Sequence, residues 1–158
     1  MKVGAIAYCH GPKGPLVCFV TSRRHKNALT LPKGIVWPDE KLATAALREL
    51  FEEAGIKGKI RRKLRPMLFT SKHQAIDDVL YFFIEIRSVS KVWPESGLRD
   101  RLFLSVEDAV VRNTSVAAKK VLQSLNKTDD LGKLIRRKPG KKYKLFAKSQ
   151  KGIKKFVA

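Results

Sequence analysis

The sequence predicts an α/β protein, and three observations support this class. Two apolar runs, Val3–Cys9 and Leu16–Thr21, flank a segment rich in glycine and proline, which is typical of a β-hairpin. A nearly continuous apolar run at Val79–Ile86 indicates a strand in the middle of a sheet. Between the helix-start signal Pro38-Asp39 and the stop signal Gly55, the pattern is helical.

The elements between and after these runs follow from local signals. Leu29–Leu31 is a short predicted strand that Pro32 ends. The helix is predicted to cover about Glu40–Ala54. The next segment, Lys59–Phe69, is predicted to be a strand that carries many basic residues.

The last predicted elements are short. Leu102–Leu104 reads as a strand, and Ser105 is a predicted N-cap because acidic residues follow it in the first helical turn. A final helix is predicted over about Ser115–Leu125. The composition changes from Lys127, so we predict a single domain over residues 1–126.

The chain is strongly basic, with 34 Lys and Arg against 14 Asp and Glu and a formal net charge of +20. Residues 127–158 carry 12 Lys and Arg against two acids, a net charge of +10, and form a basic C-terminal tail. We expect this tail to be partly ordered or docked on the domain. Its mixture of basic and aromatic residues makes RNA a candidate partner, and the alternative is a solvated segment.

Cysteine content and hydropathy bear on the compartment. Cys9 and Cys18 are too few for a disulfide framework, so we predict two buried free thiols. No apolar run approaches the ~20 residues that span a bilayer, and the N-terminal segment reads as a strand rather than an export signal. We therefore expect a cytoplasmic protein without a membrane partner, and the sequence indicates no oligomeric state.

The predicted helix presents a stripe of acids in this otherwise basic chain. At about 100° per residue, Glu49, Glu52 and Glu53 fall within one sector of the helix, while Leu50 and Phe51 lie on the other side. Like charges at this spacing repel each other. The cluster therefore predicts a partner, which is either a basic side chain or a metal ion.

The spacing around these acids is specific. Gly34, Glu40 and the run Arg48–Ile56 match the pattern G-x5-E-x7-R-E-U-x-E-E-x-G-U, where U is a bulky aliphatic residue. This pattern is the Nudix box, and the chain resembles a Nudix hydrolase at every specified position. The resemblance implies the Nudix fold, an α/β/α sandwich with a mixed β-sheet, in which the catalytic helix follows the loop at Gly34.

The resemblance also implies roles for the residues of the box. Glu49 and Glu53 would bind the metal, and Glu52 would be a further ligand or the base that takes a proton from water. Gly34 would offer its backbone carbonyl to the metal, and Arg48 would orient a glutamate through a bidentate ion pair. Carboxylates suit hard cations, so the expected cofactor is Mg²⁺ or Mn²⁺.

Segments outside the box resemble the branch of the family that cleaves diphosphoinositol polyphosphates and diadenosine polyphosphates. They read ALTLPKG, VLYFFIEI, WPE and R-x-RLFLSVEDA, the last of which runs from Arg99 to Ala109, and the resemblance covers roughly residues 3–125. In that branch a basic loop before the box contacts phosphates, so we expect the loop at residues 22–25 and the basic side chains of the quoted segments to bind the phosphates of the substrate. The predicted substrate-binding residues are Ser22, Arg23, Arg24, His25, Lys33, Arg99 and Arg101.

The implied activity is that of a Mg-dependent pyrophosphohydrolase, which hydrolyses a phosphorus-containing anhydride in a polyphosphorylated small molecule. An RNA 5′-end pyrophosphohydrolase and an RNA-binding protein on a Nudix scaffold stay open as alternatives. Asp77 and Asp78 depart from the inositol-phosphate enzymes, which are more basic at this place. A carboxylate outside the box can also join the metal site, and the candidates are Asp77, Asp78, Glu85 and Glu95.

Overall fold

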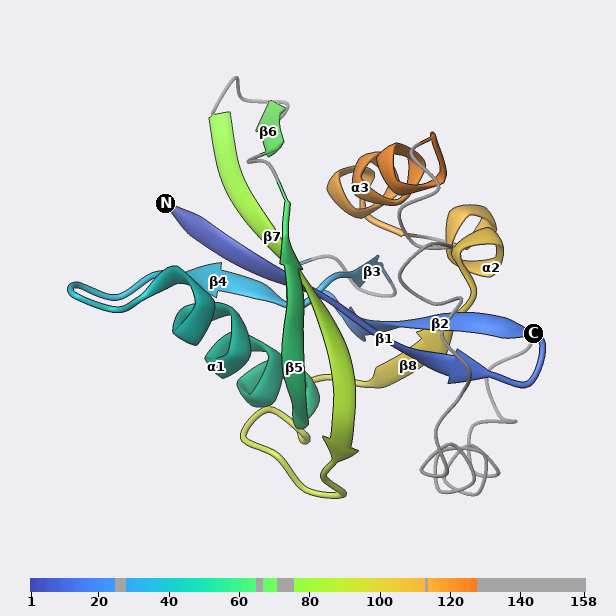
Figure 1. The fold of residues 1–158 in the computed structure, drawn as a ribbon, viewed down its shortest axis with the longest axis horizontal. Coiled ribbons are helices and arrows are strands. Elements are labelled where there is room, and N and C mark those ends of the chain that lie inside the picture. Colours follow the sequence, from blue (N-terminus) through green and yellow to red (C-terminus); the bar gives the residue numbers. More distant parts are fainter. Residues whose placement is uncertain (25–27, 65–66, 71–75, 113, 128–158) are drawn as a thin grey trace.

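One mixed β-sheet lies between helices in the computed structural model of this chain, which describes residues 1–24, 28–64, 67–70, 76–112 and 114–127 (Figure 1). Helix α1 (Leu42–Ala54) packs on one face of the sheet. Helices α2 (Val106–Val111) and α3 (Val116–Lys127) pack on the other face. The predicted α/β/α sandwich is confirmed.

The sheet has the strand order β3-β2-β1-β7-β5, with β4 paired to β1, β6 to β7 and β8 to β2. β1 and β7 run parallel and the other pairs are antiparallel, which makes the sheet mixed. The strands are β1 (Lys2–Gly11), β2 (Gly14–Thr21), β3 (Leu29–Thr30), β4 (Lys33–Ile35), β5 (Ile56–Lys63), β6 (Met67–Thr70), β7 (Ile76–Val89) and β8 (Arg101–Leu104).

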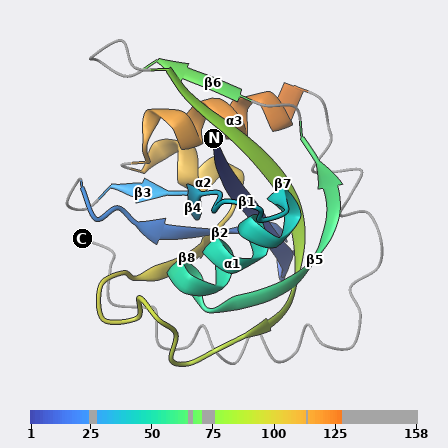
Figure 2. The ribbon, with the colours of Figure 1, turned by 90° about the vertical axis from the view of Figure 1, so that its left-hand side faces the viewer.

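The two strongest strand predictions are confirmed. β1 and β2 form the hairpin, with Gly11 opposite Gly14 at its turn. β7 lies between β1 and β5, as Figure 2 shows, and it is longer at both ends than the predicted run. Its side chains alternate between the two cores, since Phe82 packs on the α1 side and Phe83 on the side of α2 and α3.

The prediction of a single strand over Lys59–Phe69 is wrong. β5 ends at Lys63 and β6 begins at Met67, and each pairs with a different part of β7. Pro66 lies between them in the sequence and has no backbone N–H to continue a ladder. The basic segment therefore forms two strands, and both of them pair with β7.

The predicted helices are present with shifted ends. α1 begins at Leu42 rather than at Glu40, because the Glu40 side chain closes the preceding turn by accepting the backbone N–H of Trp37 at 3.1 Å. Ser105 is the N-cap of α2 as predicted, and its Oγ accepts a backbone N–H from the first turn at 3.0 Å.

The predicted thiols are also confirmed, because Cys9 and Cys18 are both free and buried. Helix α3 ends at Lys127, and residues 128–158 lie outside the described part of the chain. The domain edge at residue 126 and the state of the basic tail therefore stay predictions. Within the described ranges, no helix is long and apolar enough to cross a bilayer.

Candidate functional site

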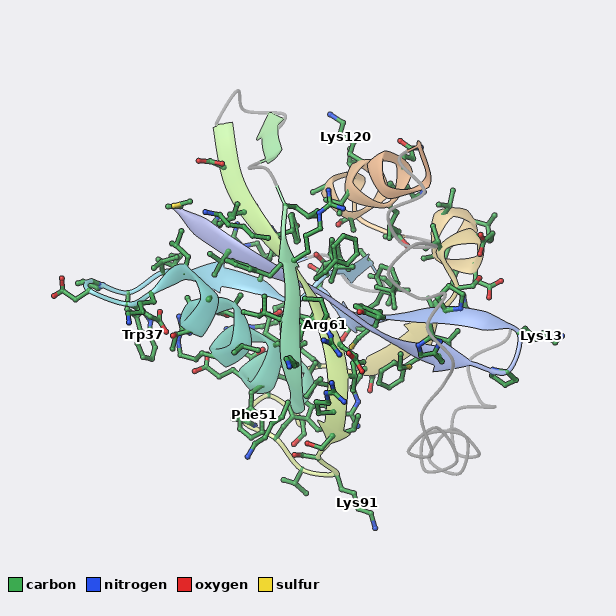
Figure 3. The ribbon with its side chains drawn as sticks, viewed as in Figure 1. Lys13, Trp37, Phe51, Arg61, Lys91 and Lys120 are labelled. Atoms are coloured by element: carbon green, nitrogen blue, oxygen red, sulfur yellow. The ribbon has the colours of Figure 1, made fainter. Side chains whose placement is uncertain are left out.

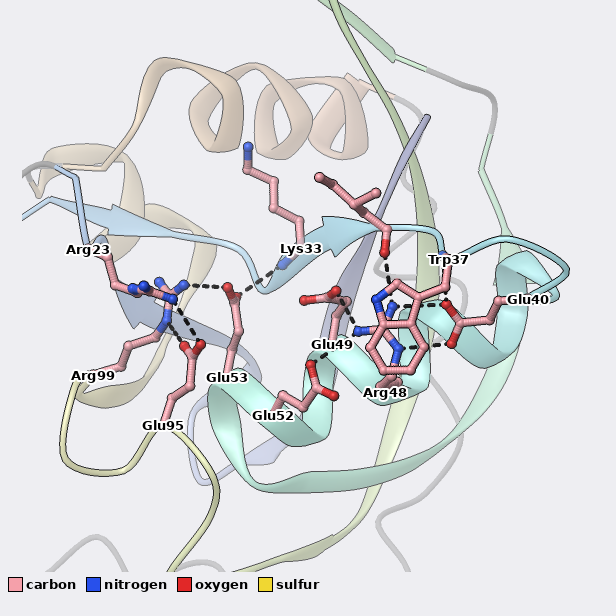
Figure 4. Close-up of polar contacts among 11 residues, drawn as sticks. Arg23, Lys33, Trp37, Glu40, Arg48, Glu49, Glu52, Glu53, Glu95 and Arg99 are labelled. Atoms are coloured by element: carbon pink, nitrogen blue, oxygen red, sulfur yellow. Dashed lines mark hydrogen bonds and ion pairs between the residues drawn. The ribbon is translucent and has the colours of Figure 1, made fainter.

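Helix α1 brings the predicted acids to the side of the molecule that faces β4. Its apolar side is buried in the core against the sheet, with Leu50 fully covered. The opposite side directs Glu49 and Glu53 toward β4, and Glu52 lies beside them on the more exposed flank (Figure 4). Packing of the apolar stripe thus fixes where the carboxylates point.

Gly34 of β4 permits the close approach of strand and helix. A Cβ atom added at Gly34 would lie 2.1 Å from the Glu49 carboxylate, so a residue without a side chain leaves room for that group. β4 is held in place by pairing with β1, where Val3 lies opposite Gly34. This strand was not predicted from the sequence, because three residues are too few to show an alternating pattern.

Glu53 is a buried carboxylate, with 6% of its surface exposed. The backbone N–H of Lys33 donates to its Oε2 at 3.1 Å, and Arg99 pairs with its Oε1. Burial still raises the pKa of Glu53 from about 4.5 to about 7, because lost hydration outweighs both of these partners. Strongly shifted groups of this kind concentrate at functional sites.

Glu49 has a related environment. Burial is the largest influence and raises the pKa of its carboxyl group, while the nearby Arg48 guanidinium lowers it and the charge of Glu52 raises it. The three acids of α1 therefore repel one another in a partly dehydrated place, which favours binding of positive charge.

Arg48 links the acids through one guanidinium group. Its Nε and Nη2 atoms donate to the two carboxylate oxygens of Glu40, both at 2.9 Å. Its Nη1 donates to Glu49 at 2.7 Å and to Glu52 at 3.1 Å. The guanidinium also lies over the ring of Trp37, 3.8 Å from its centroid. Arg48 thus forms a bidentate pair, and the hydrogen bond to it is the main reason that the pKa of Glu40 is lowered.

The segment 90–101 closes the C-terminal end of α1. The last helical carbonyls accept hydrogen bonds from the indole N–H of Trp93 and the backbone N–H of Glu95, both at 3.1 Å, and from the guanidinium of Arg101. Gly55 ends the helix with φ of 62°, and a Cβ atom there would lie 2.8 Å from Trp93. These hydrogen bonds hold segment 90–101 against the end of α1, next to the acids.

This docking places two charged side chains beside Glu53. Arg99 pairs with both Glu53 and Glu95, and it donates to the backbone carbonyl of Thr21 at 2.9 Å. Arg23 pairs with the other oxygen of Glu95 at 3.2 Å (Figure 4). Among the candidate carboxylates outside the box whose side chains the structure describes, which are Asp78, Glu85 and Glu95, Glu95 is the one that lies in this cluster. Its charge contributes to the raised pKa of Glu53.

Further predicted substrate-binding residues come from the turn after β2 and from β4. Ser22 and Arg24 form that turn, where the Arg24 N–H donates to the Ser22 Oγ at 3.3 Å. The side chain of Lys33 extends away from the Glu53 carboxylate (Figure 4). His25 lies outside the described residues.

Arg101 is placed differently from these residues. Its guanidinium donates to the carbonyl oxygen of Ala54 at the end of α1 and, at 3.2 Å, to that of Ser90. It also lies over the ring of Trp93, 4.4 Å from the centroid. Its hydrogen bonds are thus made to the backbone that closes α1.

The other candidate carboxylates lie elsewhere on the sheet. Glu85 of β7 pairs with Arg61 and Arg87. Asp78 lies near the start of β7, opposite Leu68 of β6. The side chain of Asp77 is outside the described part of the structure.

The donors of the cluster suit a divalent cation. The three acids of α1 and the carbonyl of Gly34 are hard oxygen donors on two adjacent elements. In the described ranges, no three Asp, Glu, His or Cys side chains approach closely enough to share one ion, and Arg48 and Arg99 hold carboxylate oxygens of the cluster. The residues thus fit a cation in charge and donor type, while the side chains in this structure are gathered around the guanidinium groups and not around one ion position.

Comparisons with known proteins show which family the chain resembles. A Nudix hydrolase of Arabidopsis thaliana, named Nudix hydrolase 21, chloroplastic, is 33% identical over 112 residues, which cover 68% of this chain and 57% of the relative. Diphosphoinositol polyphosphate phosphohydrolase 3-beta of Bos taurus is 32% identical over 96 residues, covering 60% of this chain and 57% of the relative. The chain thus spans 57% of the length of each of these relatives.

Solved structures show the same fold. The crystal structure of the C. elegans Ap4A hydrolase has a TM-score of 0.62 at 20% identity and covers 82% of this chain and 95% of that one. A NUDIX hydrolase from Nitrosomonas europaea has a TM-score of 0.66 at 14% identity, covering 80% and 88%. The family model described as NUDIX domain matches residues 1–125. The chain therefore belongs to the Nudix family.

Proposed function

We propose that this protein is a Mg²⁺- or Mn²⁺-dependent pyrophosphohydrolase that cleaves a phosphoanhydride bond in a polyphosphorylated small molecule. The observation that carries the proposal is the set of clustered carboxylates on α1, which faces Gly34 and is bordered by Arg23 and Arg99. The acidic side chains would bind the cations and the basic side chains would bind the phosphates, so both kinds of charge would act on the same substrate.

The proposed ligands of the cation are Glu49, Glu53 and the backbone carbonyl of Gly34, and Glu52 is either a further ligand or the base that takes a proton from water. When bound, a divalent cation supplies positive charge that neutralises the diphosphate and activates water. Arg48 holds Glu49 and Glu52 in place through its guanidinium. Its own position is fixed by Glu40, so Arg48 acts as a positioning residue for the acids.

Glu52 is the proposed general base. Its side chain is 36% exposed, so water reaches it more easily than it reaches Glu53, whose side chain is 8% exposed. In the reaction, the water oxygen forms a bond to phosphorus, the bond to the bridging oxygen breaks, and Glu52 accepts the proton from water. One phosphate-containing product leaves with the bridging oxygen.

The proposed substrate is a diadenosine polyphosphate or a diphosphoinositol polyphosphate. Curated relatives include diphosphoinositol polyphosphate phosphohydrolases, and a structural neighbour is an Ap4A hydrolase. The side chains proposed to bind phosphates are Ser22, Arg23, Arg24, His25, Lys33 and Arg99. Arg101 is proposed to act indirectly, by holding the segment that carries Arg99.

The test is a substrate panel with the purified chain. Diadenosine polyphosphates, diphosphoinositol polyphosphates, nucleotide sugars and triphosphate-ended RNA would each be incubated with Mg²⁺, with Mn²⁺ and with a chelator. We expect metal-dependent release of phosphate-containing products from one of the first two classes. Turnover of triphosphate-ended RNA alone would instead support the RNA 5′-end pyrophosphohydrolase. RNA binding without any turnover would support a binding protein on this scaffold.

The cytoplasmic location is also a proposal. Names of relatives refer to chloroplasts and mitochondria, so these two compartments are the alternatives to be tested. Fluorescence microscopy of the tagged chain would locate it.

A further inference from the structure

β5 is an edge strand with a strongly basic composition. It ends the strand order of the sheet, and five of its eight residues are Lys or Arg. All five basic residues are exposed. Together with Arg87 of the neighbouring β7 they form a surface that we name the β5 basic edge, and its members are Lys57, Lys59, Arg61, Arg62, Lys63 and Arg87.

The acid that faces this strand neutralises little of the charge. Glu85 of β7 lies opposite Lys59 in the ladder, so the two side chains are on the same face. Its carboxylate is already shared by two guanidinium groups, those of Arg61 and Arg87, the latter at 3.3 Å. Figure 3 shows Arg61 on β5, in front of the sheet. The surface keeps a clear excess of positive charge.

The shape of the surface is linear. Eight residues of strand extend over about 26 Å at ~3.3 Å per residue. Irregularities between Lys57 and Gly58 and between Ile60 and Arg62 shift the register, so that basic side chains do not strictly alternate between the two faces. A row of cations along an edge complements a chain of phosphates better than it complements a compact polyphosphate.

From this charge and shape we infer that the β5 basic edge binds the phosphate backbone of single-stranded RNA. The contacts are electrostatic, so binding is independent of base sequence and weakens steeply with salt. This binding does not depend on the proposed hydrolysis, because the six residues lie outside the carboxylate cluster. It places RNA contacts on the folded domain, separate from any that the basic tail makes.

Two other roles are conceivable for the β5 basic edge. It could bind a membrane, or its charges could prevent another chain from pairing with the edge strand. A membrane-binding face would add apolar anchors, but the exposed large apolar side chains of the described residues lie outside β5 and β7. Charges on an edge strand also hinder pairing with another chain. If the charges of β5 served only to prevent such pairing, neutralising them would cause self-association of the protein and would leave RNA binding unchanged.

The experiment compares two triple variants of the full chain that lose the same charge. The test variant is Lys57→Gln, Lys59→Gln, Lys63→Gln, with all three changes on exposed positions of β5. The matched control is Arg112→Gln, Lys119→Gln, Lys120→Gln, at the end of α2 and in α3, which lie on a different part of the fold (Figure 1). Thermal melting confirms that each variant folds.

Binding to a labelled single-stranded oligouridylate of about 20 nucleotides is measured by anisotropy over a series of salt concentrations. For the β5 variant we expect an affinity loss of about tenfold or more at low salt, and a salt slope shallower by about 2, since each lost phosphate contact removes about 0.7. The control is expected to change affinity by about twofold or less. Binding to anionic lipid vesicles is measured in parallel. The inference would be overturned by equal losses of RNA affinity in both variants, by no loss of RNA affinity in the β5 variant, or by a β5 variant that loses vesicle binding and keeps RNA binding.

Discussion

The guanidinium of Arg99 is held against the carboxylate of Glu53 in an ion pair whose two side chains are only 9% and 8% exposed. The same guanidinium binds Glu95, and Glu95 in turn pairs with Arg23. A proposed cation ligand is thus already neutralised by a basic side chain from another part of the chain. A cation that uses Glu53 must compete with Arg99 for it.

This competition gives a prediction for Arg99→Gln. Removing the guanidinium leaves the buried Glu53 carboxylate without its charged partner, so the melting temperature without added metal should fall. The increase in melting temperature on adding Mg²⁺ should become larger than in the natural protein, and calorimetry should show metal affinity stronger by about tenfold. Arg112→Gln serves as the control. Weaker metal binding in Arg99→Gln would mean that Arg99 supports the ligand geometry rather than competing for it.

Glu53→Gln should lower kcat by about 10²-fold or more while the protein stays folded. The amide keeps the size of the side chain but loses the charge proposed to bind the cation and position water. Steady-state kinetics on the substrate found in the panel gives the comparison, and circular dichroism checks the fold. Glu107→Gln in the first turn of α2 is the control. Activity within about threefold of the natural protein, with an unchanged fold, would remove Glu53 from the proposed ligands.

The acids of α1 could be predicted from the sequence because their relationship is local. Helical spacing alone places Glu49, Glu52 and Glu53 on one side of an amphipathic helix. Glu95 and Arg99 could not be assigned in this way. Arg99 lies 46 residues from Glu53 in the chain and meets it because segment 90–101 satisfies the open carbonyls at the end of α1. A tertiary contact of this kind leaves no periodic signal.

In the fold too, features that depend on local sequence were predictable and features that depend on distant contacts were not. The hairpin and the central strand β7 were predictable, since a turn and a long apolar run are local features. The break between β5 and β6 and the short strand β4 depend on pairing with distant strands. Pro66 was the available signal for the break, because it cannot donate to a ladder.

The pKa of Glu53 predicts how stability depends on pH in the presence of a chelator. The folded protein raises this pKa from about 4.5 to about 7, mainly through burial. Between these values the folded state keeps a proton that the unfolded chain releases, so this contribution to stability is fully present below pH 4.5 and is lost as the pH rises to about 7. Glu53→Gln should flatten the fall of melting temperature over this window. An unchanged slope would mean that another group causes the dependence.

Gly34→Ala tests the close approach of β4 and α1. The added Cβ atom would lie 2.1 Å from the Glu49 carboxylate, which is the far end of a flexible side chain, so that group can move aside without unfolding the core. We therefore expect a small change in melting temperature, a loss of metal affinity and a fall in kcat of about tenfold or more. Gly97→Ala is a matched control, because a Cβ atom there meets no other atom within 4 Å and should change none of these quantities. If Gly34→Ala destabilises the protein strongly while the remaining folded enzyme keeps its kcat, the glycine is needed for packing and Glu49 is not held in place by it.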